Sequence, residues 1–394
     1  MYIGQGLGCT IEVKDTAQVK TRFLAIYDFG STTGNTAPAM TYAQNCVLNR
    51  TPNGAAAPVI DAIYVSHLDK DHYNLLGTLS DSINYPPQAP VVPLVDYFYI
   101  GGIQNVNQLP ADFAGMLAKF NINHALNIPG GYKHAGNDPY ALPGVFPLWP
   151  ISPALTHDFS HYQLRLIPLL YRGNLLNAVH FPAWSQGPAN VLINAGSIIL
   201  LVTVVDTTQP AVLNPHRFSA LFTGDATMST LAEFVGANAV PLTQPIQGNF
   251  IFTQEYKFVT VPHHGSERTV RDILNGGGPH TFHALNSFIG NFSPHSAMAS
   301  AQSSNWGHPR ASTMAQFYAA TTMPAQVPGG YPPMVPAPPL NPQHDIQVYD
   351  AHGASTEVPR DRHIYTTVYN QGLWGRGFTA TFSEANNNVA IAIL

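Results

Sequence analysis

Charged side chains are scarce in this 394-residue sequence, where Asp, Glu, Lys and Arg make up 10% of the residues against roughly 25% in a typical soluble domain. The 17 Lys and Arg and the 22 Asp and Glu give a net charge of -5. No basic run follows a long phosphate backbone, so a polyanionic duplex is a poor match for the whole chain. Polar functions therefore fall largely on Asn, Ser, Thr, Gln and the 17 histidines.

Cysteines and long apolar runs are also nearly lacking. The two cysteines, Cys9 and Cys46, allow at most one intrachain disulfide, and their spacing fits no cysteine-based zinc motif. The longest apolar run, 197–205, is far shorter than the roughly 20 residues that span a bilayer. The N-terminus also lacks the basic start and apolar stretch of a secretory signal. We therefore expect a cytoplasmic protein that does not bind membranes.

The length fits one sizeable α/β domain with insertions, or one domain with an appendage, and a hydrophobic fraction of 45% is ordinary for such a domain. Within it, 84–186 combines clustered prolines with many aromatics, which predicts an insertion of loops and short elements. Over 311–394 we expect a proline-rich linker, centred on 324–342, and short strands that pack on the main domain. Short β-branched or apolar runs predict strands at 9–13, 23–27, 59–65, 191–205, 217–222 and 258–261.

Three of these predicted strands lead directly into histidine or aspartate. The first is followed by four potential metal ligands within six residues, namely His67, Asp69, Asp71 and His72. The other two lead to Asp225 and to the pair His263 and His264, and Gly265 after the pair permits close backbone approach. Ligands at the carboxyl ends of strands are typical of sites in α/β sheets.

The residue types in these three segments favour a metal centre. Carboxylates held close together repel each other and raise each other's pKa, so a bound cation is the natural compensation. Each segment alone also fits an ordinary charged or surface turn, but the ordered set favours two divalent ions about 3.5–4 Å apart. Mixed carboxylate and imidazole ligands suit Zn²⁺ or Mn²⁺ and do not separate the two.

The ordered motifs resemble the metallo-β-lactamase superfamily, and within it the hydrolase domain of the ComEC-like competence proteins and their stand-alone relatives. The resemblance covers about 1–310 with the insertion set aside, and it implies the αββα sandwich of that family. Leu7 departs from the family's acidic residue, and His157, His161 and His180 all lack the context of a separate third-motif histidine. The matching segments are Ile3-Gly4-Gln5-Gly6, Tyr27-Asp28-Phe29-Gly30, Ser66 to His72, Asn194 with Ser197, Thr223 to Ala226, Val261 to Ser266, and Trp306-Gly307-His308-Pro309.

The resemblance also implies roles for single residues. Of the histidine pair we favour His263 as the ligand, because it leaves the strand first, and Asp28 is expected to orient a ligand loop. Asp71 or Asp225 would accept a proton, and His264 or His308 would protonate the leaving group. A histidine that merely begins a helix is the alternative for His308. The implied metal ligands are His67, Asp69, Asp71, His72, Asp225, and His263 or His264.

The function expected from this resemblance is that of a phosphodiesterase or nuclease-like hydrolase. Two divalent ions would lower the pKa of a water molecule towards neutrality and so supply hydroxide for attack. The cationic side chains that would line a cleft for a small phosphodiester or a single nucleic-acid strand are Lys70, Arg268, Arg271 and Arg310.

The alternative function is that of a hydrolase of a neutral ester, lactone or amide. A catalytically silent binding protein is a third hypothesis, which the complete ligand set argues against.

Overall fold

The computed structural model divides the chain into two compact units, each described by itself below: 1–143 with 170–198, and 144–169 with 199–394. Both contain a mixed β-sheet and helices, so the chain is an α/β protein. The described residues are 6–15, 20–31, 36–83, 91–101, 109–126, 149–150, 155–170, 194, 197–208, 216–232, 256–271, 281–300, 308–320, 346–349, 355–358, 364–366, 378–383 and 388–393.

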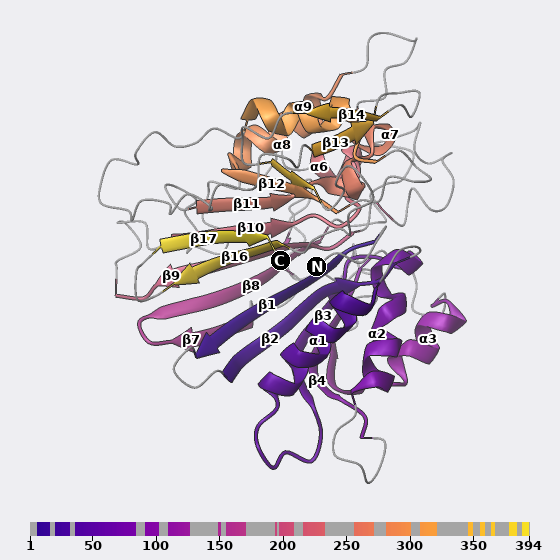
Figure 1. Ribbon diagram of the computed structural model, residues 1–394, viewed down its shortest axis with the longest axis vertical. Coiled ribbons are helices and arrows are strands. Elements are labelled where there is room, and N and C mark those ends of the chain that lie inside the picture. Colours follow the sequence, from indigo (N-terminus) through magenta and orange to yellow (C-terminus); the bar gives the residue numbers. More distant parts are fainter. Residues whose placement is uncertain are drawn as a thin grey trace, which may run out of the picture. The chain divides into compact units, whose positions relative to one another are not determined.

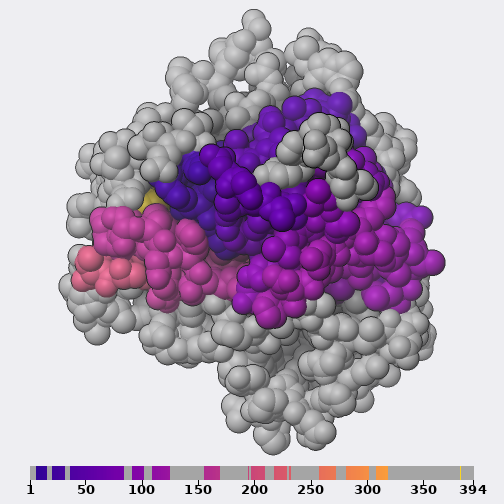
Figure 2. All heavy atoms as spheres, turned by 90° about the horizontal axis from the view of Figure 1, so that it is seen from below, coloured from indigo at the N-terminus to yellow at the C-terminus, as the bar shows by residue number. Residues whose placement is uncertain are grey.

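The first unit is a five-stranded sheet with helices on one face (Figure 1). β1 and β2 pair antiparallel, whereas β2, β3, β4 and β5 are successively parallel. One helix connects each consecutive pair of parallel strands, as parallel pairing requires. Figure 2 views the surface of this unit, coloured indigo to purple. The elements are β1 (Gly8–Asp15), β2 (Lys20–Phe29), α1 (Ala37–Arg50), β3 (Val59–Val65), α2 (Lys70–Ser82), β4 (Leu94–Ile100), α3 (Ala111–Leu117) and β5 (Asn121–Leu126).

The core of the first unit lies between the sheet and its helices. Every second residue of a strand points to this side, as with Ile63 and Val65 of β3, and both are fully buried. α2 contributes Tyr73, Leu76 and Leu79, whose three-residue spacing places them on one helix face. Full burial of such a side chain stabilises the fold by roughly 1.5–3 kcal/mol. The carboxyl end of β3 and the start of α2 are therefore held on a rigid platform.

The second unit contains an eight-stranded mixed sheet in the order β15-β12-β11-β10-β9-β8-β6, with β7 paired to β8. β10, β11, β12 and β15 are parallel, and β7 to β10 pair antiparallel. All eight residues of β9 are buried, as expected for a central strand covered on both faces. The sheet strands are β6 (Trp149–Pro150), β7 (Leu155–Phe159), β8 (Tyr162–Leu170), β9 (Ile199–Asp206), β10 (His216–Phe222), β11 (Tyr256–Thr260), β12 (Ser296–Ala299) and β15 (Ile364–Thr366).

Helices and two small hairpins complete the second unit. α8 connects the parallel strands β11 and β12, and its buried residues recur at helical spacing from Ala284 to Phe292. The hairpins β13–β14 and β16–β17 each form a separate two-stranded sheet. The elements are α6 (Met228–Ala232), η5 (Pro262–Gly265), α7 (Glu267–Val270), α8 (His283–Phe292), α9 (Ala311–Ala320), β13 (Ile346–Tyr349), β14 (Ser355–Val358), β16 (Phe378–Ser383) and β17 (Asn388–Ile393).

The part of 84–186 that the structure describes consists of short elements, as the sequence suggested. This range supplies β4, α3 and β5 to the first unit and β6, β7 and β8 to the second. The hairpin between β7 and β8 turns through Ser160, which has a left-handed φ of 54°. Glycine or asparagine is the usual signal for such a turn, and neither residue stands here. Strands expected near the C-terminus are confirmed as β13, β15 and β17, and β15 pairs with β12 at the sheet edge.

Some expectations fall outside the described residues. These include the proline-rich segment 324–342, the residues Ile3-Gly4-Gln5 and Trp306-Gly307, and His180. Within the described part of the chain, no helix is both long enough and apolar enough to cross a membrane.

The two cysteines are free thiols, and both are buried. Burial raises the pKa of the Cys9 thiol to about 11 and that of the Cys46 thiol to about 12. Because the thiolate is the reactive form, we expect neither cysteine of the native protein to react with a thiol reagent at mildly alkaline pH. Spectrophotometric thiol titration should detect both only after denaturation. Rapid modification of either in the folded protein would contradict this burial.

Candidate metal centre

The first group of candidate ligands follows β3. Because β2 and β3 are parallel, with Tyr27 opposite Tyr64, their carboxyl ends lie at the same edge of the sheet. The chain leaves β3 through Ser66 and His67 and enters α2, whose N-cap is Asp69. The remaining two candidates, Asp71 and His72, lie in the first turn of α2. We call residues 66–72 the ligand loop.

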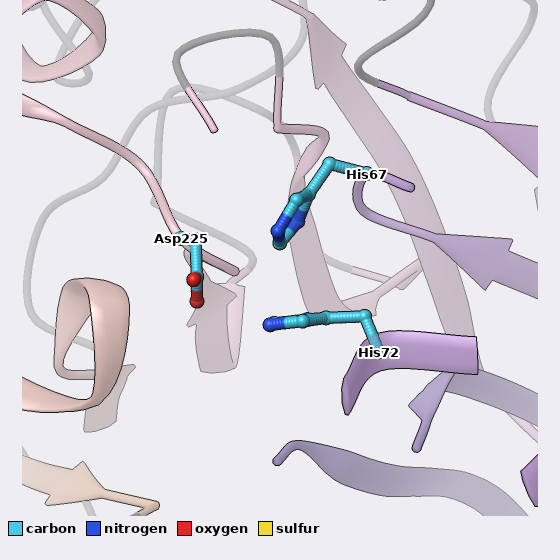
Figure 3. Close-up of side chains that lie close together, drawn as sticks. All are labelled: His67, His72 and Asp225. Atoms are coloured by element: carbon cyan, nitrogen blue, oxygen red, sulfur yellow. The ribbon is translucent and has the colours of Figure 1, made fainter. Parts of the chain in front are cut away.

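The ligand loop brings its histidines and carboxylates together. His67 and His72 are fully buried, their ring centroids lie 4.1 Å apart, and both rings point to the same side (Figure 3). His67 Nε2 lies 3.5 Å from Asp69 Oδ2. Ligand atoms of Asp71 and His72 lie within 4.8 Å of each other. All four predicted ligands of this unit therefore converge on one region.

Asp28 holds the ligand loop from the neighbouring strand. It is fully buried and has a left-handed φ of 53°, which turns its carboxylate towards the end of β3. Oδ1 accepts a hydrogen bond from the Ser66 backbone N–H at 2.6 Å, and Oδ2 accepts one from the Ser66 hydroxyl at 2.7 Å. Oδ2 also lies 2.8 Å from His72 Nδ1. These contacts confirm that Asp28 orients the ligand loop.

Glycines allow the backbone to pack directly against the ligand loop. A Cβ atom at Gly30 would lie 2.4 Å from the Tyr73 nitrogen, and one at Gly101 would lie 2.0 Å from the Ser66 carbonyl oxygen. Gly6 approaches the Asp71 carbonyl oxygen in the same way, and Leu7 N–H donates to that oxygen at 3.2 Å. A side chain at any of these glycines would displace the backbone that carries the candidate ligands.

The second unit repeats this arrangement at two parallel strands. Asp225 lies three residues after the end of β10, and His263 lies three residues after the end of β11. The two turns are tied together, because Thr223 N–H donates to Thr260 Oγ1 at 2.8 Å and His263 N–H donates to the Gly224 carbonyl at 3.0 Å. Equal offsets on paired strands therefore place the carboxylate beside the histidine pair.

Both histidines of the pair face the Asp225 carboxylate. His263 Nε2 lies 3.5 Å from Oδ2, and His264 Nε2 lies 3.5 Å from Oδ1. Asp225, labelled in Figure 3, and His264 are buried, whereas the His263 side chain is 19% exposed. His264 Nδ1 donates to the Ser300 carbonyl at 2.5 Å. A carbonyl oxygen only accepts, so Nδ1 of His264 carries the proton and Nε2 carries the lone pair.

The histidine pair has strained backbone. His263 and His264 have φ values of 47° and 53°, and Gly265 follows at 82°. Left-handed conformations at residues other than glycine cost about 1–3 kcal/mol each. The absence of a side chain at Gly265 lets Pro309 approach, since a Cβ there would lie 2.5 Å from Pro309 Cβ. This confirms the close approach expected at Gly265.

The other predicted site residues lie nearby or are engaged elsewhere. The ring centroid of His308 is 6.4 Å from that of His263, and burial, reinforced by His264 and His263, lowers the pKa of His308 to about 3. His308 is therefore neutral near pH 7. Lys70 pairs with Asp112 at 3.0 Å, and Arg271 lies 3.7 Å from Glu267, so these two cations of the expected phosphate cleft already have carboxylate partners.

Comparison with known proteins adds no family assignment. The chain matches no protein-family model, and a search of curated proteins returned no match either.

The donor atoms present fit divalent metal ions. Imidazole nitrogen and carboxylate oxygen bind zinc at about 2.0–2.2 Å, so two such atoms on one tetrahedral ion lie about 3.4 Å apart. The Nε2 atoms of His67, His263 and His264 each lie 3.5 Å from an aspartate oxygen. This is longer than a good N–H···O hydrogen bond and close to the separation that a shared ion imposes. The chemistry and the spacing of the donors therefore agree with metal ligation.

Apart from Asp28, the groups that orient these donors were not identified from the sequence. Ser66 was recognised only as a member of a motif, although its hydroxyl contacts Asp28 and both histidines. The Ser300 carbonyl carries no sequence signal, because any residue type offers that acceptor. Ser66 directly follows the end of β3 and precedes the first candidate ligand, so a role for it could have been inferred.

Gly30→Ala tests whether close backbone packing positions the ligand loop. Its Cβ would collide with backbone of residues 71–73, and relief of such overpacking costs about 1–3 kcal/mol or more. We expect a lower melting temperature and reduced zinc content. Gly115→Ala in α3 is the matched control, because its Cβ meets nothing within 4 Å and alanine favours helix. Equal zinc content and stability in both variants would refute the role of this packing.

Proposed function

We propose that the chain is a metal-dependent hydrolase of the metallo-β-lactamase fold that acts on phosphodiesters. The observation that carries this proposal is the set of three imidazoles, two of them buried, whose Nε2 atoms lie 3.5 Å from aspartate oxygens. Imidazoles and carboxylates with this spacing are unusual as plain hydrogen-bonded pairs, but they suit ligands of Zn²⁺ or Mn²⁺. The order of the motifs along the chain and the mixed sheet in each unit support the finer assignment of fold.

The proposed ligands are His67, Asp69, Asp71 and His72 in the first unit, and Asp225 with His264 in the second. We choose His264 over His263, the opposite of the preference from sequence. The hydrogen bond to Ser300 fixes the proton of His264 on Nδ1, and a metal-bound histidine usually donates its other ring N–H in this way. His264 is also the more buried of the two.

The proposed chemistry divides between metal and protein. Bound divalent ions would lower the pKa of water and balance charge that develops on the phosphoryl oxygens. Asp71 and Asp225 are the carboxylates that would accept a proton. His308, neutral near pH 7 because burial lowers its pKa to about 3, would donate a hydrogen bond to the substrate rather than act as a cationic acid. The sequence-based candidates for the proton donor to the leaving group were His264 and His308; with His264 proposed as a ligand, His263, the more exposed of the pair, takes this role instead.

The low net charge favours a small diester or a single strand over a duplex as substrate. With a net charge of -5, the chain lacks the broad positive surface that holds a polyanion. Phosphate recognition would then rest on the metal ions and on a few local groups. The proposed substrate class is therefore a phosphodiester contacted over a short length.

Hydrolysis of bis(p-nitrophenyl) phosphate by the purified protein, with zinc and with manganese, tests the proposed function. We expect metal-dependent turnover that falls about 100-fold or more in Asp71→Asn and in Asp225→Asn. Even substitution of a residue that only hydrogen-bonds to a metal ligand commonly lowers metal affinity or activity by about 10–100-fold. Metal content, measured by mass spectrometry, should fall in the same variants. Asp158→Asn is the matched control, because Asp158 is an exposed carboxylate on β7, and both quantities should be unchanged.

The other functional classes predict different results. Stoichiometric bound metal without diester turnover would transfer the assignment to esters, lactones or amides. Protein that takes up neither zinc nor manganese would overturn the proposal and favour a binding protein.

A further inference from the structure

Ser66 occupies a central position among the buried polar groups of the first unit. Its hydroxyl oxygen lies 2.7 Å from Asp28 Oδ2, 2.9 Å from His67 Nδ1 and 3.2 Å from His72 Nδ1. All four residues are fully buried. Burial makes the placement of each proton consequential, because two facing lone pairs without a proton between them are costly in a low-dielectric interior.

The number of protons in this cluster is limited. An ionised carboxylate only accepts, and a serine hydroxyl has a single hydrogen. That hydrogen is donated to Asp28. At 2.9 Å the contact between Ser66 Oγ and His67 Nδ1 must then be bridged by a hydrogen on the histidine. Nδ1 of His72 likewise requires a hydrogen, because it faces the same Asp28 oxygen at 2.8 Å.

We propose that Ser66 is a positioning residue that transmits the orienting effect of Asp28 to His67. One buried carboxylate then holds both histidines in the tautomer with the proton on Nδ1, His72 directly and His67 through the serine hydroxyl. Nε2 is the nitrogen that carries the lone pair in each ring. The use of these lone pairs by a metal rests on the proposed function, whereas the tautomers are a property of the metal-free protein.

Ser197 offers the competing arrangement. Its hydroxyl lies 3.3 Å from His67 Nδ1. If this hydroxyl donated to Nδ1, the proton of His67 would lie on Nε2, and Nε2 would then have no lone pair for a metal ion. Ser66 is closer at 2.9 Å, and its single hydrogen is already committed to Asp28. The geometry therefore assigns Ser66 as the acceptor that decides the tautomer and leaves Ser197 as a second, weaker acceptor.

Two substitutions distinguish the direct contact of Asp28 with His72 from its indirect effect on His67 through Ser66. Ser66→Ala removes the nearer acceptor of His67 and leaves the Ser197 hydroxyl, 3.3 Å away, to donate to Nδ1. The contact between Asp28 and His72 remains, so only His67 should change tautomer. Asp28→Asn keeps an oxygen for the Ser66 backbone N–H and places an NH₂ group towards the Ser66 hydroxyl and His72 Nδ1. This amide donates where the carboxylate accepted, so both histidines should move their proton to Nε2.

Nitrogen-15 NMR of the imidazoles in metal-free protein tests these expectations. We expect the Nδ1–H form for both histidines in the unsubstituted protein, a change at His67 alone in Ser66→Ala, and a change at both in Asp28→Asn. Zinc affinity, measured by competition with a chromogenic chelator, should fall about 10–100-fold in Ser66→Ala. Ser66→Thr keeps the hydroxyl and should restore both the His67 tautomer and most of the affinity.

Ser197→Ala is the matched control, since it removes a hydroxyl from the same histidine and should leave the tautomer of His67 in place. The Ser66 backbone hydrogen bond survives in every serine variant, and thermal unfolding checks that each is folded. An unchanged His67 tautomer in Ser66→Ala, or a change in Ser197→Ala instead, would overturn the proposal. Correct tautomers in a protein that binds no metal would support it while refuting the proposed function.

Discussion

The buried carboxylate of Asp28, near the end of β2, is the constraint on which the arrangement of the ligand loop depends. Asp28 has no exposed surface, and an ionised group in such a place is costly unless hydrogen-bond donors surround it. Its donors come from Ser66 and His72, at the two ends of the ligand loop. The ligand loop therefore supplies the hydrogen-bond donors that the buried Asp28 carboxylate needs, and the carboxylate in turn holds the ligand loop in place.

Parallel strand pairing extends the same principle to both units. The carboxyl ends of parallel neighbours meet at one edge of a sheet, so residues that follow two strands at similar offsets become neighbours. Asp28 meets Ser66 in this way across β2 and β3, and Asp225 meets His263 across β10 and β11. His264 reaches a third strand end through the Ser300 carbonyl, one residue after β12. Within each unit, the convergence of candidate ligands is thus largely a consequence of sheet topology.

Sequence patterns predicted the elements that carry their signal locally. β3 was expected at 59–65 and is observed at Val59–Val65, because a compact β-branched run between polar loops has few alternatives. The candidate ligands were found for a similar reason, since unusual residue types follow these strands directly. Short elements were expected within 84–186, but the individual strands were not located, because prolines flank them and the turn at Ser160 uses no glycine.

Contacts that depend on three-dimensional placement could not be predicted from the sequence. Gly30 and Gly101 are separated by 71 positions, yet both press against the ligand loop. The tautomers of His67 and His264 likewise depend on a hydroxyl and a main-chain carbonyl. Residue type alone specifies neither acceptor. The preference for His263 as ligand therefore rested on chain order, because the sequence does not show which ring nitrogen of each histidine carries the proton.

The location of backbone strain gives independent support for a functional role of the histidine pair. His263 and His264 both adopt left-handed conformations, at a cost of about 1–3 kcal/mol each. Hydrogen bonds from His263 to Gly224 and from Arg310 to Gly265 hold the turn in place. A simpler turn would avoid this cost but would not present two imidazoles to the same carboxylate. Strain concentrated at the candidate donors is what a turn shaped for ligand placement requires, whereas an ordinary connection between β11 and α7 would have no need of it.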